Sequence, residues 1–448
     1  MNTRDLVLSM LKEIYAGKEF SHIILRQVLE KYDYLEGKEK AFIKRLTEGT
    51  LERTIELDYV INQFSQTPVH KMKPLIRSLM RMSVYQILYM DSVPDSAVCN
   101  EAVKLASLHK FSALKGFVNG VLRNIVRNKE KISYPEKEKS YLEYASITYS
   151  LPVWMVEHFM KEYGKEKAEE IFEGLLLEKP VTIRMKETVT EEEKLHLLKL
   201  WKEQGIGTRV HSYLPYAYVL EKTEGLKHVP GFLEGKFMVQ DVSSMLVVQV
   251  AGIENGMQIL DVCAAPGGKA THAAEKLAGT GRVIARDLNG YKADFIRENA
   301  ERLQLMNLEA EEWDACVFDR SKEEWADILF CDAPCSGLGI MGKKRDIKYR
   351  LTPENLKEVA FLQKQILETV WRYVKKEGIL MYSTCTINSE ENEKQVQWIV
   401  ENLPFEVVSI KEELPEDLKA EEGKFGLQLL PKLHESDGFF LCKLKRIG

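Results

Sequence analysis

Two cysteines in the C-terminal half of the chain each follow an apolar segment and lie among small residues. One is Cys335, in Asp332-Ala333-Pro334-Cys335-Ser336-Gly337, and the other is Cys385, in Ser383-Thr384-Cys385. An isolated free cysteine is usually a small buried hydrophobe, and we expect that of Cys99, Cys316, Cys331 and Cys442. Cys335 and Cys385 differ because each sits in a turn after a predicted strand. We therefore predict a nucleophilic cysteine, a second cysteine and the Asp332 carboxyl group in one site.

A cysteine needs help from its surroundings to be a nucleophile. With an ordinary pKa near 8.5, only about 3% of a thiol is thiolate at neutral pH. A nearby cation or a helix N-terminus raises that fraction. Lys269 and the start of the helix after Cys335 are the candidates in this sequence.

A third segment, Leu260-Asp261-Val262-Cys263-Ala264-Ala265-Pro266-Gly267-Gly268-Lys269, is typical of a strand that runs into a glycine-rich turn. Glycine has no Cβ, so the backbone of such a turn can approach a ligand closely. A helix is predicted to begin near Lys269, and its free N–H groups would point into the turn. We expect the cofactor to be bound by Cys263, Ala264, Ala265, Pro266, Gly267, Gly268 and Lys269, and also by Asp332.

The composition of this turn excludes two common cofactor classes. A phosphate-binding loop has Gly-x-x-x-x-Gly-Lys-Ser/Thr, but Cys263 and Ala270 occupy the positions of the first glycine and the final hydroxyl. The dinucleotide fingerprint Gly-x-Gly-x-x-Gly is absent as well. A nucleoside cofactor without a pyrophosphate remains, and S-adenosylmethionine is the common one.

Two acidic residues after the next strands fit that cofactor. Asp287 follows about twenty residues after the glycines, where a carboxylate at a strand end can accept both ribose hydroxyls. Asp314, in Trp313-Asp314-Ala315, either bonds the adenine amino group or is an ordinary loop residue. In register after successive strands, the binding role is favoured for Asp287, and both roles stay open for Asp314.

Alternating strands and helices must position these motifs. From about residue 236 the sequence predicts strands at 258–262, 282–286, 328–331, 379–382 and 439–444, with helices near 270–278, 290–304, 354–375 and 389–401. That order is typical of an α/β fold with a mostly parallel sheet between helices. Ligands bind such sheets at the carboxyl ends of the strands, and all three motifs fall at such ends.

The length of 448 residues predicts two or three domains. Residues 3 to about 131 show helical periodicity throughout, which predicts an all-helical domain over 1–138. Residues 139–235 are mixed, with a strand at Val181–Met185, and we predict a small α+β linking module there. The domain with the three motifs then occupies 236–448.

The charge is unevenly distributed along the chain. The window from Lys71 to Lys131 holds eleven basic and four acidic residues, a net +7, whereas the whole chain carries −5. Lys115, Arg123 and Arg127 are spaced at multiples of four, which gives a cationic stripe on one predicted helix. Such a basic module suits a polyanion partner, although a helical surface with uneven lysines would show the same pattern.

Other patterns bound the functional class. No apolar run approaches a membrane span and no signal peptide is evident, so we expect a cytoplasmic protein with no membrane partner, acting as a monomer. Seven cysteines without paired spacing argue for free thiols and against a disulfide framework or a zinc site. We therefore expect no bound metal.

At this point the motifs resemble a known family. Leu-Asp-Val-Cys-Ala-Ala-Pro-Gly-Gly-Lys, Asp-Ala-Pro-Cys-Ser-Gly, Ser-Thr-Cys-Thr with Glu390-Glu391-Asn392-Glu393, and Asp437-Gly438-Phe439-Phe440 are similar to those of RNA cytosine-C5 methyltransferases. Phe117-Val118-Asn119-Gly120-Val121-Leu122-Arg123 resembles the NusB-type RNA-binding bundle. The combination resembles bacterial methyltransferases of 16S (small-subunit) rRNA. It implies a Rossmann-like, S-adenosylmethionine-dependent domain after an all-α NusB-like domain and the α+β module.

The resemblance also implies roles for the site residues. Cys385 would add to C6 of a cytosine of 16S rRNA, flipped out of its stack, and Asp332 would hydrogen-bond or protonate N3. Cys335 would assist release as a base, and Lys269 would orient Asp332. We expect the basic loop Lys343–Arg350 to grip RNA phosphates. Arg286 departs from the family, in which a small or apolar residue usually precedes the ribose-binding acid.

Two alternatives remain beside this interpretation. One is a DNA cytosine methyltransferase with Cys335 as the nucleophile, although the Glu-Asn-Val segment of that class is not found near the site. The other is an RNA-binding assembly factor that has the fold but no activity. Intact Cys385, Cys335 and Asp332 argue against the second.

Overall fold

The structure is a computed structural model that describes residues 2–178, 180–223 and 225–448. The chain divides into two compact units. The first comprises Met1–Leu177 together with Met341–Arg350, and the second comprises Glu178–Ile340 together with Leu351–Gly448. A short segment from the middle of the C-terminal sequence is thus part of the first unit.

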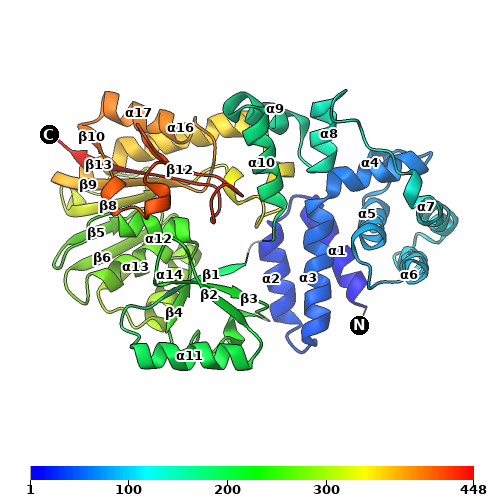
Figure 1. The fold of residues 1–448 in the computed structure, drawn as a ribbon, viewed down its shortest axis with the longest axis horizontal. Helices are drawn as coiled ribbons and strands as arrows, with labels where there is room; N and C mark the ends of the chain where they lie inside the picture. The colour runs from blue at the N-terminus through cyan, green and yellow to red at the C-terminus, as the bar shows by residue number, and fades with distance from the viewer. Residues whose placement is uncertain (1, 179, 224) are drawn as a thin grey trace. The chain divides into compact units, whose positions relative to one another are not determined.

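The first unit is helical, as predicted (Figure 1). Its helices are α1 (Thr3–Tyr15), α2 (Ser21–Lys31), α3 (Gly37–Glu52), α4 (Thr54–Phe64), α5 (Pro74–Tyr89), α6 (Asp95–Leu108), α7 (Lys115–Arg127), α8 (Tyr141–Thr148), α9 (Val153–Tyr163), α10 (Lys165–Leu176) and the short α15 (Ile347–Arg350). Helices α8 to α10, which the sequence analysis grouped with the linking module, cluster with this unit.

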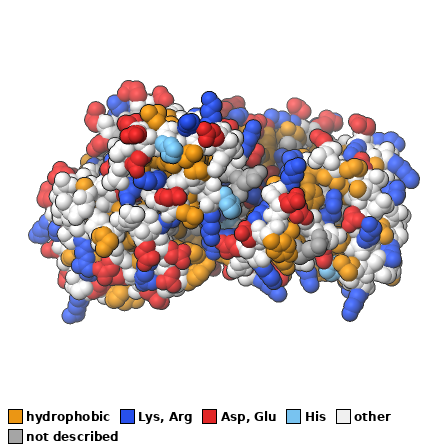
Figure 2. All heavy atoms as spheres, turned by 90° about the horizontal axis from the view of Figure 1, so that it is seen from below, with side chains coloured by type: hydrophobic (Ala, Val, Ile, Leu, Met, Phe, Trp, Pro, Cys, Tyr) orange, Lys and Arg blue, Asp and Glu red, His pale blue; other side chains and the backbone are white. Residues whose placement is uncertain are grey.

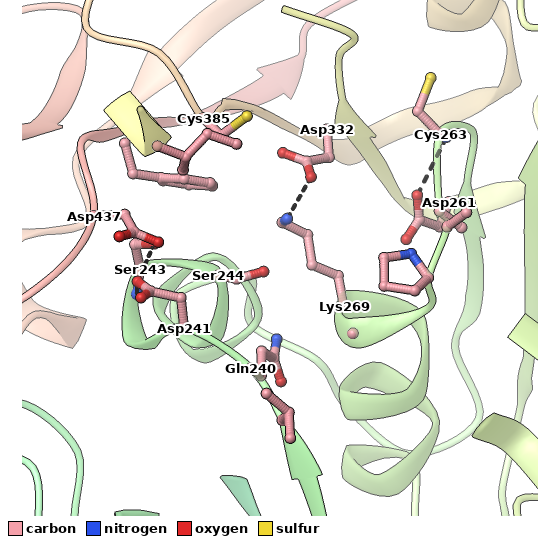
Figure 3. Close-up of a pocket in the computed structure, with 17 residues that line it drawn as sticks. Gln240, Asp241, Ser243, Ser244, Asp261, Cys263, Lys269, Asp332, Cys385 and Asp437 are labelled. Atoms are coloured by element: carbon pink, nitrogen blue, oxygen red, sulfur yellow. Dashed lines mark hydrogen bonds and ion pairs between the residues drawn. The ribbon is translucent and has the colours of Figure 1, made fainter. Parts of the chain in front are cut away.

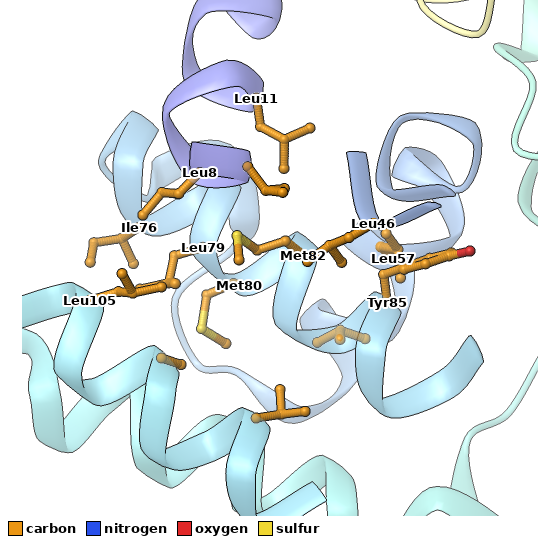
Figure 4. Packing of buried hydrophobic residues seen from close by; sticks show 14 of the residues in the cluster. Leu8, Leu11, Leu46, Leu57, Ile76, Leu79, Met80, Met82, Tyr85 and Leu105 are labelled. Carbon is orange, nitrogen blue, oxygen red and sulfur yellow. The ribbon is translucent and has the colours of Figure 1, made fainter. Parts of the chain in front are cut away.

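Helix α5 forms the centre of the bundle. It is buried around most of its circumference, as expected of a helix with neighbours on several sides. Leu79, Met80 and Met82 of α5 pack against Leu8 of α1 and other apolar residues (Figure 4). Burial of this apolar surface is the main force that holds the bundle together.

The second unit contains a small antiparallel sheet in the order β2-β3-β1-β4. Its strands are β1 (Val181–Met185), β2 (Gly207–Val210), β3 (Ala217–Glu221) and β4 (Phe237–Val239), accompanied by α11 (Glu191–Glu203). The predicted strand at Val181–Met185 is confirmed. Trp201 of α11 is fully buried against this sheet, where its ring meets Phe237 edge-on.

The second unit also contains a large mixed sheet in the order β11-β12-β13-β9-β8-β5-β6-β7, with β10 paired to β13. Its strands are β5 (Gln258–Asp261), β6 (Arg282–Asp287), β7 (Leu308–Glu312), β8 (Ala326–Asp332), β9 (Val374–Thr384), β10 (Phe405–Val408), β11 (Glu422–Gly423), β12 (Gly426–Leu429) and β13 (Phe439–Arg446). The five strands from β9 to β7 are parallel, and β13 lies antiparallel to β9. The predicted α/β fold is confirmed.

Helices cover both faces of the large sheet, and neighbouring strand residues alternate between two cores. Ile259 belongs to the core with α12 (Val242–Gln249), α13 (Gly268–Lys276) and α14 (Gly290–Arg302). Leu260 belongs to the core with α16 (Pro353–Val370) and α17 (Glu393–Asn402). This alternation is the two-residue period of a strand buried on both faces.

No helix within the described residues is both long enough and apolar enough to span a bilayer.

Candidate functional site

The three predicted motifs meet at one edge of the large sheet. β5, β8 and β9 are adjacent and parallel, and they end at Asp261, Asp332 and Thr384. The glycine turn and both cysteine turns therefore leave the sheet on the same side (Figure 3). This confirms the predicted placement of the motifs at carboxyl ends of strands.

The two cysteines are in direct contact. In the pairing of β8 with β9, Asp332 lies opposite Ser383, so the turns that follow run side by side. The sulfurs of Cys335 and Cys385 are 3.1 Å apart, and one thiol donates a hydrogen bond to the other. This hydrogen bond, together with burial, raises the pKa of Cys335 well above its usual range. Cys335 is thus the thiol that keeps its proton.

Asp332 is held from two sides. Nζ of Lys269 lies 2.6 Å from one carboxylate oxygen, and the hydroxyl of Ser383 donates to the other at 2.7 Å. Lys269 is largely buried and its ammonium lies 5.3 Å from the centre of the Phe439 ring. The Asp332 side chain is 31% exposed, and these two contacts fix the position of its carboxylate. The predicted contact of Lys269 with Asp332 is present.

The glycine turn is joined to the end of β6. Gly267 has φ +100°, a conformation that L side chains rarely adopt, and it precedes the first residue of α13. Asp287 accepts a hydrogen bond from the backbone N–H of Ala265 at 3.0 Å and pairs with Lys292 at 2.9 Å. The carboxylate of Asp287 is therefore fixed beside the turn.

Asp314 follows β7 in an exposed turn, where its carboxylate accepts from the N–H of Cys316 at 2.9 Å. The N–H of the preceding residue, Trp313, donates to the carbonyl of Asp287 at 2.9 Å. The turn that carries Asp314 is thus joined to the residue expected to bind the ribose. Binding of the adenine amino group by Asp314 stays a prediction.

Arg286, the residue that departs from the family pattern, forms ion pairs with acidic residues other than Asp287. Its guanidinium pairs with Glu311 at 2.7 Å and with Asp319 at 2.6 Å, and it lies 4.8 Å from the Trp313 ring. The charge of Arg286 is therefore neutralised by Glu311 and Asp319. Asp287 keeps its contacts with Ala265 and Lys292.

A cavity of about 240 Å³ lies between these elements. Eight predicted site residues line it: Cys263, Ala264, Ala265, Pro266, Gly268, Lys269, Asp332 and Cys385. Gly267, Asp287, Asp314 and Cys335 do not line it. The sequence analysis assigned no site role to the other lining residues, namely Val239, Gln240, Asp241, Ser243, Ser244, Asp261, Ile340, Asp437 and Phe439.

Asp241 and its neighbours carried a sequence signal that indicates local structure only. Asp241 precedes α12 and accepts from the N–H of Ser243 at 3.1 Å, which is an N-cap. An Asp-x-Ser pattern after a strand predicts a helix start. It gives no indication that the helix begins at the wall of a cavity.

Asp261 at the end of β5 is a buried acid in this cavity. One carboxylate oxygen accepts weakly from the N–H of Cys263 at 3.4 Å, and the other has no hydrogen-bond partner in the described part of the chain. Burial raises the pKa of Asp261 to about 7, although the nearby Lys269 acts in the opposite direction. Asp261 can therefore change its charge near neutral pH.

A buried polar network lies beneath the cysteine turns. The carboxylate of Glu391 accepts from the N–H and hydroxyl of Ser336, at 2.8 and 2.6 Å, and from Asn388 at 2.8 Å. Asn392 donates to the carbonyl of Thr386 at 3.1 Å. The network thus ties the residue after Cys335 and the residue after Cys385 to one segment.

A close backbone contact completes the wall of the site. Gly339 donates to the carbonyl of Cys385 at 3.2 Å and accepts from the N–H of Gly438 at 3.0 Å. A Cβ at Gly339 would lie 1.9 Å from the Gly438 carbonyl oxygen. Only glycine permits this approach, which brings the segment of Asp437 and Phe439 to the cysteine turns.

The other cysteines follow the prediction with one exception. Cys99, Cys331 and Cys442 are buried, as expected. Cys316 is exposed, so the prediction that it is a buried hydrophobe is wrong. It lies in the turn capped by Asp314, where no apolar strand or helix face buries it.

The basic loop Lys343–Arg350 has protein partners in the first unit. Arg345 pairs with Glu48 at 2.6 Å and with Glu52 at 2.9 Å. Lys348 is buried and donates to the Glu52 carbonyl at 2.7 Å. Arg345 and Lys348 thus already have protein partners, and RNA binding by the loop stays a prediction.

Comparisons with known proteins cover nearly all of the chain. Residues 1–127 match the NusB family, residues 151–226 match the RsmF/B-like ferredoxin-like domain, and residues 248–445 match the family described as 16S rRNA methyltransferase RsmB/F. A probable ribosomal RNA small subunit methyltransferase B of Bacillus subtilis is 34% identical over 100% of this chain and 99% of its own length. A counterpart from Synechocystis is 30% identical over 100% of both chains.

Solved structures share the fold. The crystal structure of PH0851 superposes with a TM-score of 0.83 at 24% identity and covers 100% of this chain and 99% of its own. A methyltransferase homolog protein from Pyrococcus horikoshii gives a TM-score of 0.58 at 25% identity, over 69% of this chain and 100% of its own. With two relatives matched end to end, the chain belongs to the RsmB/F family of 16S rRNA methyltransferases.

Proposed function

We propose that this protein transfers a methyl group from S-adenosylmethionine to C5 of a cytosine in 16S rRNA through a covalent adduct between Cys385 and C6. The observation that carries the proposal is the pair of thiols 3.1 Å apart, beside an Asp332 carboxylate held by Lys269. Chemistry at C5 needs two such groups, because one must add to the ring and another must take the displaced proton.

The residues at the sheet edge fit S-adenosylmethionine. The glycine turn, with Gly267 in a conformation that favours glycine, leaves the backbone of Ala265 and Gly268 open to the cavity. Asp287, fixed by the N–H of Ala265, offers a carboxylate for ribose hydroxyls. When bound, the cofactor supplies an electrophilic methyl group on a sulfonium centre. Asp314, in the turn joined to Asp287 through Trp313, is the candidate for the adenine amino group.

Cys385 is the better nucleophile of the pair. It lines the cavity, whereas Cys335 does not. Cys335, whose pKa is raised, can donate the S–H···S hydrogen bond to the Cys385 sulfur. The Cys385 thiolate can then add its electron pair to C6, which makes C5 electron-rich.

Asp332 and Lys269 act on the ring as charge develops. We propose that the Asp332 carboxyl group, once protonated, donates a hydrogen bond or its proton to N3, while Lys269 and Ser383 keep that group in place. Preorganised groups of this kind stabilise a transition state without reorganising during the reaction. To expose its face to Cys385, the target base must leave its stack.

Cys335 serves the release step. Once Cys385 is a thioether, its hydrogen bond no longer raises the pKa of Cys335, so Cys335 can pass its proton to water. The resulting thiolate takes the proton from C5, the electron pair re-forms the ring double bond, and Cys385 leaves as a thiolate. A ribosomal RNA substrate places this reaction in the cytoplasm, and we propose that one chain suffices for it.

Single substitutions distinguish the roles of the two cysteines. Cys385→Ala should abolish methyl transfer and adduct formation, since no thiolate can add to C6. Cys335→Ala should form the adduct and accumulate it, because the C5 proton is not removed. Methyl transfer into 16S rRNA and a shifted protein–RNA band on denaturing gels measure the two steps. Mapping 5-methylcytosine in rRNA of cells with and without the gene identifies the base.

The outcome also decides between the alternatives. An adduct that disappears in Cys335→Ala and persists in Cys385→Ala would reverse the assignment of the nucleophile. A wild-type protein that binds rRNA and S-adenosylmethionine without turnover would support the inactive assembly factor. The matched control is Cys99→Ala, a buried cysteine of the helical unit.

A further inference from the structure

Arg184 of β1 links the small sheet to the glycine turn. Its side chain is 1% exposed, and its guanidinium pairs with Glu275 at 2.8 Å. It also donates to the carbonyl of Gly268 at 3.0 Å and to the hydroxyl of Thr271 at 3.4 Å. All three partners belong to α13, the helix that begins at the turn. Arg184 therefore fixes the first turns of that helix.

Gln240 is the second partner of Arg184 and lies at the cavity. It follows β4, lines the cavity and is 5% exposed. Its side-chain oxygen accepts a hydrogen bond from Nη1 of Arg184. Its Nε2 group is buried and has no hydrogen-bond partner among residues 2–178, 180–223 and 225–448. In Figure 3 the amide nitrogen of Gln240 points into the cavity.

Arg184 dictates this orientation of the amide. A guanidinium group donates hydrogen bonds and accepts none, so it must face the oxygen of Gln240. The NH₂ group is then directed to the opposite side. A buried donor without a partner is unfavourable, and a bound ligand with an acceptor would satisfy it.

We propose that Arg184 and Gln240 form a relay in which Arg184 is a positioning residue and Gln240 donates a hydrogen bond to an oxygen of the bound ligand. The inference rests on the proposed function, because it assigns a residue to the same cavity. It gives the small sheet of the second unit a role in ligand binding.

The ligand oxygen is a carboxylate or a carbonyl. The side chain of Gln240 lies beside Gly268, where a Cβ would be 3.6 Å from its amide carbon. The first N–H groups of α13 lie at the same place and favour an anion. This neighbourhood favours the carboxylate of the amino-acid part of S-adenosylmethionine. The carbonyl of the target base is the other source of the same chemistry.

Two ligands distinguish the cofactor carboxylate from the base carbonyl as the source of the oxygen. S-Adenosylhomocysteine has the amino-acid carboxylate, whereas methylthioadenosine lacks it. With Gln240→Leu, the dissociation constant for S-adenosylhomocysteine should rise by about tenfold to a hundredfold. The constant for methylthioadenosine should stay within about twofold of wild type. Calorimetry on the full chain measures both. The control is Gln249→Leu, a glutamine of α12 that bonds Tyr216 and lies outside the cavity lining.

The positioning role of Arg184 needs its own variant. Arg184→Met alone would leave the Glu275 carboxylate buried without its cation, so it is combined with Glu275→Leu. This double variant should bind S-adenosylhomocysteine more weakly and methylthioadenosine as tightly as the wild type does, which is also the result expected for Gln240→Leu. Adding Gln240→Leu to it should cause little further loss, because the two residues act through one hydrogen bond.

Each outcome of these measurements either supports the relay or overturns it. Unchanged binding of both adenosine ligands with a raised KM for RNA and an unchanged kcat would assign the donor to the base carbonyl and support the relay. Equal losses for both ligands, or no change in either ligand or RNA, would overturn it. Wild-type protein that binds neither ligand would refute the proposed cofactor, and the relay with it. If the wild-type protein binds both ligands and the variants change neither ligand binding nor the KM for RNA, the relay is refuted and the proposed cofactor is not.

Discussion

At the scale of single residues, the site depends on which groups carry charge at neutral pH. Cys335 keeps its proton because Cys385 and burial raise its pKa, and Asp332 forms an ion pair with Lys269. Asp261, only one strand away, has a pKa raised to about 7 by burial. The same edge of the sheet thus holds one acid with a cation partner and one acid that titrates.

The titration of Asp261 predicts a pH-dependent stability. Between about pH 4 and pH 7 the unfolded chain releases this proton while the folded chain keeps it, so stability falls as pH rises. With a shift of about three pH units, the loss is up to about 4 kcal/mol, and it is complete above the folded pKa. Asp261→Asn should therefore gain thermal stability relative to wild type as pH rises from 4.5 to 8. Melting curves of both proteins across this range measure the difference.

Asp294→Asn, an exposed carboxyl on α14, controls for the removal of one negative charge. A melting difference between wild type and Asp261→Asn that is constant from pH 4.5 to 8 would contradict the buried titration.

The sequence predicted the cysteines, Lys269, Asp332 and the glycine turn because each lies in a short motif beside a strand end. It did not predict Arg184, Gln240 or Glu275. Their contacts span 56 and 91 positions in the chain, and the second of them joins the small sheet to helix α13. Nothing in the local pattern of β1 distinguishes an arginine that is buried from one that is solvated.

At the scale of elements, strand existence was predictable and strand length was not. β5, β6, β8 and β13 lie where apolar runs predicted them. The predicted helix at 354–375 ends at Val370, and β9 begins at Val374, five residues before the predicted strand. The first part of β9 contains Lys375, Lys376 and Glu377, whose polar side chains are partly exposed and conceal the strand. β9 begins at Val374 because that residue pairs with Ala326 of β8, so the strand includes these polar residues.

The turns after β8 and β9 depend on one buried carboxylate. Glu391→Ala should leave the Ser336 N–H and hydroxyl and the Asn388 amide without their acceptor. Because each buried donor without a partner costs about 1–3 kcal/mol, we expect a loss of about 2–5 kcal/mol and a lower melting temperature. Methyl transfer should also fall, since the residue after Cys335 loses its anchor. Glu391→Gln, which keeps one acceptor oxygen, should restore part of both.

Glu390→Ala provides the matched control, because Glu390 is the exposed neighbour and pairs with Lys394 on the surface. If the two alanine variants lose equal stability, the network has no special role in holding the cysteine turns.

At the scale of the whole molecule, charge is divided along the chain. The window from Lys71 to Lys131 carries +7, so the remainder of the chain carries −12. Part of the basic excess is neutralised in the structure, since Arg81 pairs with Asp58 at 2.6 Å and Lys129 with Asp95 at 3.0 Å. On the face drawn in Figure 2, Lys and Arg side chains lie among Asp and Glu. Net charge alone therefore does not identify an RNA-binding surface.

The cationic stripe predicted on α7 is present. Lys115, Arg123 and Arg127 are exposed, on the side of α7 away from buried Val118, Leu122 and Ile125. Because Arg345 of the basic loop is engaged by Glu48 and Glu52, this stripe is the RNA-binding candidate with the more accessible cations.

Neutralising the stripe tests whether the helical unit binds RNA. In Arg123→Gln/Arg127→Gln, affinity for 16S rRNA fragments should fall, because fewer phosphate counterions are released on binding. The slope of log K against log salt should decrease in magnitude by about 1.5–2, close to one per lost cation. Binding titrations between 50 and 200 mM salt, concentrations at which such slopes are resolved, measure this. Lys199→Gln/Lys202→Gln removes two exposed charges from α11 as the matched control. An equal slope change in the control would show a general charge effect, and an unchanged slope in the α7 variant would exclude the stripe from RNA binding.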